Sequence, residues 1–170
     1  MSELFRQSLL AQYQATHRGE PWYGSSRAQL LQGISAARAA QAPFVTLPSI
    51  WAVVLHMTAW TEEVHRRLEG APPTTPQRGD WPSIPSAGNA PVTDAAWRSA
   101  QRVLTRAHNR LVAAIAAQPG SRFPQSVAAL THDDSSTSTL TVAQMLLGLV
   151  QHDAYHLGQI ATLRRLVARE

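Results

Sequence analysis

Helix signals dominate this sequence, and no alternating strand pattern persists along it. Apolar residues recur at helical spacing in four long segments, which cover residues 2–16, 48–68, 93–118 and 141–167. Helices with one apolar face bury that face against each other. The sequence therefore predicts an all-α fold, a four-helix bundle that forms one domain over residues 1–170.

The ends of these segments carry recognisable start and stop signals. Thr141 and Gln144 form a capping box at the start of the last helix, and Pro48 suits the first turn of the second. Gly70 and the prolines after it end the second helix. The chain stays rich in proline and glycine as far as Pro91, which predicts a long crossover loop between the second and third helices. Such a loop would let these two helices run parallel.

Composition limits the chemistry and the location of the protein. Cysteine is absent, so disulfides, thiolate ligands and a cysteine nucleophile are excluded. The first residues lack the apolar core of a signal peptide, and no apolar run reaches the length of a membrane span. The expected protein is cytoplasmic and does not enter a membrane.

The basic residues are unusual because all fifteen are arginines. Four of them recur at every fourth position of the third predicted helix: Arg98, Arg102, Arg106 and Arg110. Such a stripe could contact nucleic acid or an acidic partner. The net charge is only +4, however, and no recognition-helix signal surrounds the stripe. A solvated helix face is therefore the preferred interpretation, and nucleic-acid binding is not expected.

Three histidines are candidates for a metal site. His152 and His156 lie four residues apart in "HDAYHLGQI", on one helix face and about 6 Å apart along the axis. His56 interrupts the apolar run "IWAVVLHMTAW", where a lone imidazole is costly unless its nitrogens have partners. One divalent ion would satisfy all three rings, and helix bundles build metal sites from facing helices in this way. The alternative is that His152 and His156 are half-buried and bond to carbonyl groups or solvent.

Several other side chains lie near these positions along their helices. Candidates for a pocket wall, or for holding a ligand in place, are Trp60, Glu63, Tyr155 and Gln159. Core packing is the preferred role of Trp60, and an ion pair with Arg66 or Arg67 that of Glu63. Asp153 is expected either to support a metal ligand or to lie on the helix surface. The remaining histidines are expected to be exposed to solvent: His17, His65, His108 and His132.

Two segments resemble the DinB/YfiT-like superfamily of metalloenzymes: "SIWAVVLHMTAWTEEVHRRLEG" and "LLGLVQHDAYHLGQIATLRR". The "PWYGSS" and "DWP" stretches are similar to one branch of that family. The resemblance implies a four-helix bundle of up-down-down-up topology, often assembled as a homodimer. It also implies a divalent metal, with zinc or nickel expected, whose three histidine ligands correspond to His56, His152 and His156.

The same resemblance implies an activity. Family members include transferases and isomerases that use low-molecular-weight thiols such as bacillithiol or mycothiol, so a metal-dependent S-transferase with a thiol cosubstrate is expected. A bound metal lowers the pKa of a thiol or a water and so supplies a nucleophile at neutral pH. A metal-dependent hydrolase would need the same ligands and is the first alternative. The second alternative is a damage-inducible protein with a binding role and no catalysis.

Overall fold

The computed structural model describes residues 3–84, 92–128 and 139–167, and these are mainly helical. The helices are α1 Glu3–His17, α2 Arg27–Leu31, α3 Ala36–Ala40, α4 Ile50–Leu68, α5 Asp94–Ala117 and α6 Val142–Leu166. The prediction of a mainly helical protein is confirmed. No helix in the described residues is long and apolar enough to cross a membrane.

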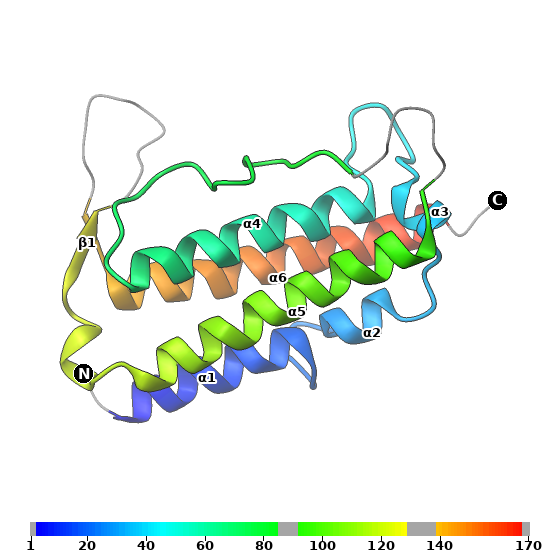
Figure 1. Cartoon of the computed structure of the whole chain (residues 1–170). Helices are drawn as coiled ribbons and strands as arrows, with labels where there is room; N and C mark the ends of the chain where they lie inside the picture. The colour runs from blue at the N-terminus through cyan, green and yellow to red at the C-terminus, as the bar shows by residue number, and fades with distance from the viewer. Residues whose placement is uncertain (1–2, 85–91, 129–138, 168–170) are drawn as a thin grey trace.

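The four long helices pack around a shared core. Both α1 and α4 contact α5 and α6, so α1 and α4 lie at opposite corners of the bundle. Figure 1 shows that α4 and α5 run in one direction, whereas α1 and α6 run in the other. The segment after α4 returns along the outside of that helix (Figure 1), as a crossover requires. Residues 85–91 of the predicted loop lie outside the described residues.

Several small elements were not predicted, among them the 3₁₀ helix η1 Gly120–Arg122. The five-residue helix α3 follows α2, and the short strands β1 Ser126–Ala128 and β2 Thr139–Thr141 pair antiparallel. Three residues are too few to display an alternating pattern, so the expectation of no strands is wrong at this point. His132 belongs to the residues between the two strands that the structure leaves undescribed.

Local hydrogen bonds explain where the long helices begin. The Gln144 side chain accepts from the Thr141 N–H at 2.8 Å, and Thr141 Oγ1 accepts from the Gln144 N–H at 3.2 Å. The predicted capping box of α6 is therefore confirmed. The start of α4 differs from the prediction, because Ser49 caps it by accepting from the Ala52 N–H at 3.1 Å. Pro48 thus precedes the helix instead of forming its first turn.

The apolar core has two parts with polar side chains between them. Along α6, Leu149 and Val150 belong to one cluster, whereas Leu157 and Ile160 belong to the other. Asp153, which lies between these pairs, is fully buried. A polar layer therefore separates the two apolar clusters about halfway along α6, where His152 and His156 also lie.

The predicted exposure of His108 is wrong. Its side chain is only 2% exposed and packs against Tyr13 and His17, with ring centroids 4.3 and 4.7 Å away. Burial, reinforced by the charge of Arg27, lowers the pKa of His108 to about 3. The signal was present in the sequence, because His108 continues the apolar stripe of Leu104 and Leu111 on α5.

This buried histidine should make stability depend on pH. An unfolded histidine has a pKa of about 6.5, so between that value and the folded pKa the unfolded chain binds more protons. The folded protein therefore keeps its full stability above pH about 6.5. As the pH falls from there towards the folded pKa of His108, its free energy of unfolding decreases. We expect His108→Phe to reduce this acid sensitivity. Urea unfolding of metal-free wild type and variant at pH 7, 6, 5 and 4 would measure it, and equal pH slopes would contradict the assignment.

Candidate metal centre

Helices α4 and α6 bring the three predicted histidines together. The Nε2 atom of His152 lies 3.0 Å from Nε2 of His56 and 3.1 Å from Nε2 of His156. All three potential ligand atoms lie within 4.8 Å of one another. His56 and His156 are buried, whereas 26% of the His152 side chain is exposed. Access to the cluster is therefore on the His152 side.

Hydrogen bonds orient two of the three rings. The Nδ1–H of His56 donates to the carbonyl oxygen of Asp80 at 2.6 Å, and that of His156 donates to Oε1 of Gln159 at 2.7 Å. A neutral imidazole that carries its proton on Nδ1 presents a lone pair on Nε2. Both Nε2 lone pairs consequently face the third ring. Outer contacts of this kind are typical of histidines that bind metals.

The arrangement fits a divalent ion better than hydrogen bonds among the rings. A proton on Nε2 of His152 can point at only one of its two neighbours, so the other contact would join two lone pairs. Nitrogens at 2.0–2.1 Å from one tetrahedral ion are about 3.3 Å apart, close to the 3.0 and 3.1 Å that separate Nε2 of His152 from those of His56 and His156. Burial lowers the pKa of His56, and that of His156 to about 4, so both rings are neutral at pH 7.

Asp153 lies directly behind His152. It is 0% exposed, which contradicts the option of a surface position on the helix. Its Oδ1 atom is 3.7 Å from Nδ1 of His152, and neither carboxylate oxygen has a hydrogen-bond partner among the described residues. The Nδ1 atom of His152 has none there either. Of the three rings, His152 is thus the one without an orienting hydrogen bond, and the carboxylate next to it is free to accept one.

The segment after α4 covers one side of the cluster. The Trp81 ring stacks on the His56 ring, with centroids 4.0 Å apart and planes at 13°, and its centroid is 5.9 Å from that of His156. Trp60 fixes this segment, because its Nε1–H donates to Oδ1 of Asp80 at 2.7 Å. Asp80 and Trp81 were not among the predicted site residues. The sequence signal for them was the "DWP" stretch.

Trp60, Tyr155 and Gln159 all lie near the histidines. The Trp60 ring centroid is 6.2 Å from that of His152, and the Tyr155 centroid is 5.1 Å from that of His156. Gln159 joins His156 to Tyr155, since its Nε2 donates to the tyrosine oxygen at 3.1 Å. Tyr155 and Gln159 also line a pocket of about 320 Å³, whose wall includes Leu47.

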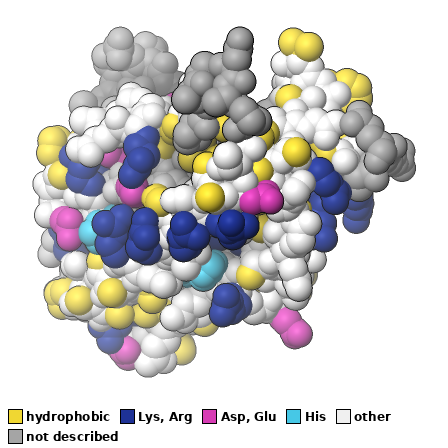
Figure 2. Space-filling model, turned by 45° about the vertical axis from the view of Figure 1, so that its right-hand side comes forward, with side chains coloured by type: hydrophobic (Ala, Val, Ile, Leu, Met, Phe, Trp, Pro, Cys, Tyr) yellow, Lys and Arg dark blue, Asp and Glu magenta, His cyan; other side chains and the backbone are white. Residues whose placement is uncertain are grey.

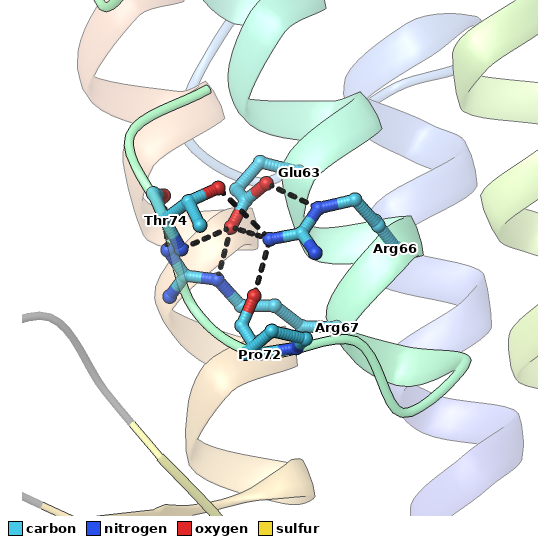
Figure 3. A network of polar contacts seen from close by, with 5 residues as sticks. All are labelled: Glu63, Arg66, Arg67, Pro72 and Thr74. Atoms are coloured by element: carbon cyan, nitrogen blue, oxygen red, sulfur yellow. Dashed lines mark hydrogen bonds and ion pairs between the residues drawn. The ribbon is translucent and has the colours of Figure 1, made fainter. Parts of the chain in front are cut away.

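Glu63 is not part of the histidine cluster. Figure 3 shows its carboxylate between Arg66, Arg67 and the start of the long loop. It accepts from Arg66 Nε at 2.9 Å, Arg67 Nε at 2.7 Å and the Thr74 N–H at 3.0 Å. Burial favours a raised pKa, but these hydrogen bonds outweigh it, and the pKa of Glu63 is lowered. The preferred pairing with Arg66 and Arg67 is what the structure shows, and it attaches the loop to α4.

The fold and the site together define a helical-bundle protein with a three-histidine centre. The chain belongs to the DinB superfamily, whose family model matches residues 26–160. Its structure is similar to the crystal structure of a conserved protein from Enterococcus faecalis, with a TM-score of 0.65 and 15% sequence identity. That match covers 99% of this chain and 97% of the other, and at this identity it shows the fold alone. No curated protein matches the sequence.

Proposed function

We propose that this chain is a metal-dependent transferase in which His56, His152 and His156 hold one divalent ion. The observation that carries the proposal is the convergence of the Nε2 atoms of three histidine rings. In two of these rings the Nδ1–H group already donates a hydrogen bond to another residue. Zinc and nickel suit a set of imidazole ligands. When bound, the ion would lower the pKa of a thiol or a water molecule at a position that the protein leaves open.

The surrounding residues would orient the ligands and shape the approach. Trp81 shields the His56 side of the cluster, so a cosubstrate would enter beside the partly exposed His152. The pocket at Tyr155 and Gln159 offers a place for the apolar part of an electrophile. Because the chain has no cysteine, a sulfur nucleophile must come from a small thiol. The family resemblance favours this choice over water as the nucleophile.

A thiol-transfer assay tests the proposal. The thiol sulfur would form a bond to the ring carbon of 1-chloro-2,4-dinitrobenzene, chloride would leave, and the thiol proton would pass to the buffer. We expect His156→Ala to lower the rate by at least about a hundredfold, as loss of an activating group does. His65→Ala is the control, because that ring is not part of the cluster. Equal rates for wild type and His156→Ala, across several thiols and ester substrates, would leave no catalytic role for the centre. Activity towards esters without thiol would favour the hydrolase instead.

We further propose that Asp153 positions His152 by accepting its Nδ1–H once metal is bound. Removal of such a contact typically lowers metal affinity by about 10–100-fold. We expect this loss in Asp153→Ala and a smaller one in Asp153→Asn, which keeps an acceptor oxygen. Competition titration with a chromophoric chelator would measure the affinities, and melting of the metal-free proteins would separate this effect from general destabilisation. Equal metal affinity in wild type and Asp153→Ala would refute the role.

Two expectations about partners stay predictions. Assembly as a homodimer follows from the family resemblance and is testable by sedimentation. Nucleic acid is not a proposed partner. Tight duplex binding at physiological salt, lost on changing Arg102 and Arg106 to glutamate, would overturn that view.

A further inference from the structure

A second cavity lies apart from the three histidines. It has a volume of about 530 Å³ and is formed by the end of α1, by α2 with the turn after it, and by the first half of α5. Its lining includes none of His56, His152 and His156. Small-molecule sites commonly have volumes of about 300–1,000 Å³, so this one can hold a metabolite-sized ligand.

The lining combines an apolar floor with positive charge. Four buried apolar side chains contribute to it: Leu31, Ile34, Trp97 and Leu104. Its charged residues are Arg18, Arg27, Arg98 and Asp94, so the arginines outnumber the carboxylate. Oδ1 of Asp94 already accepts from the Ala36 N–H at 2.7 Å. The lining therefore has an excess of positive charge beside an apolar surface.

The two outer arginines are free to bind a ligand. Arg18 and Arg98 are exposed, and their side chains form no hydrogen bond or ion pair with any described residue. Arg98 also begins the row of exposed α5 arginines that continues with Arg102 and Arg106. Figure 2 shows such a row of basic side chains across one face of the molecule. A surface of this kind attracts anions from solution.

The inner arginine, Arg27, is buried, and no described carboxylate contacts its guanidinium directly, although the charge of Asp153 opposes the effect of burial on its pKa from farther away. Arg27 is 2% exposed, and its Nη2 donates to Nδ1 of His17 at 2.7 Å. His17 is neutral at pH 7, since burial and the nearby charges of Arg27 and Arg18 lower its pKa to about 4. Nη1 of Arg27 has no partner among the described residues, and no described carboxylate forms an ion pair with it. Because its Nη1 has no acceptor in the described part of the chain and Asp153 forms no ion pair with it, the Arg27 guanidinium can donate to an anion that enters the cavity.

We infer that this cavity binds a small organic anion, namely a carboxylate with an apolar body. Arg27, Arg18 and Arg98 would hold the carboxylate, because guanidinium groups match its planar geometry. The body would lie on the floor that Trp97 and Leu104 contribute to. This binding is independent of the metal-dependent reaction proposed above, since the two sites have no lining residue in common.

Calorimetric titration with octanoate tests the inference. The neutral octanamide, of nearly equal size, reports on the need for a negative charge, and inorganic phosphate reports on the need for an apolar body. We expect octanoate to bind once per chain and at least tenfold more tightly than either probe. Metal-free protein and His152→Ala should bind octanoate as well as wild type does, which separates this result from any failure of the metal proposal.

Matched substitutions locate the binding. The double variant Arg18→Gln, Arg98→Gln changes exposed side chains and should fold, and we expect it to bind octanoate at least tenfold more weakly. Arg106→Gln is the control, because Arg106 is another exposed α5 arginine that does not line this cavity. The inference is overturned if octanoate does not bind, if octanamide or phosphate binds equally well, or if the double variant keeps wild-type affinity.

Discussion

Replacing His152 with alanine should remove stoichiometric metal from the protein. Nε2 of this residue lies within 3.1 Å of both other ligand atoms, so it is the centre of the cluster. Without it only two imidazoles are left, one fewer than even an open catalytic zinc site provides. We expect the content after dialysis to fall from about one ion per chain to below about one tenth. Elemental analysis by mass spectrometry would measure it, with His56→Ala expected to behave in the same way.

His65→Ala is the matched control for these variants. His65 lies on α4 like His56, but it is partly exposed and its nearest charged partner is Glu69 at 3.7 Å. We expect this variant to keep full metal content. Full occupancy in both His152→Ala and His56→Ala would instead show that the ion, if any, is bound elsewhere.

Glu63→Ala should cause the largest loss of stability among the changes considered. Glu63 is 2% exposed, and its removal leaves the buried guanidinium of Arg67 without its carboxylate partner. Breaking a buried ion pair from one side typically costs about 3–5 kcal/mol. The Thr74 N–H would lose its acceptor as well, which weakens the attachment of the loop that carries Trp81. Urea unfolding at pH 7 would measure the change in the free energy of unfolding.

The neighbouring Glu62 provides the comparison. Its ion pairs with Arg78 and Arg110 lie at the surface, where the two arginine side chains are 55% and 62% exposed. Exposed pairs of this kind contribute about 0–1 kcal/mol. We therefore expect Glu62→Ala to be nearly neutral. Similar losses for the two variants would mean that the Glu63 network does not hold the loop to α4.

The three candidate ligands could be predicted from the sequence because each takes part in a local pattern of residues. His56 is a polar residue inside an apolar helix, and His152 with His156 has the spacing of one helix face. The start of α6 was predictable for a similar reason, since Thr141 and Gln144 act within one turn. Patterns confined to one helix thus identified the residues that the bundle brings together.

Features that depend on distant parts of the chain were harder to predict. Asp80 contacts His56 only because the loop doubles back along α4, and no local spacing encodes that path. Asp153 is buried because α6 has neighbours on more than one side, including α1 and α4. Its charge therefore gave a misleading indication of exposure. The exposure of His108 was wrongly predicted because histidine is a polar residue type. Its position on the apolar stripe of α5 indicates burial instead.

X-ray absorption spectroscopy of protein purified without chelators tests the central claim most directly. We expect one divalent ion per chain with three imidazole nitrogens at about 2.0–2.1 Å if the metal is zinc, together with at least one oxygen ligand from solvent. Addition of a small thiol should replace that ligand by sulfur at about 2.3 Å. An ion with only oxygen ligands, or protein that takes up no divalent ion when zinc and nickel are supplied, would contradict it.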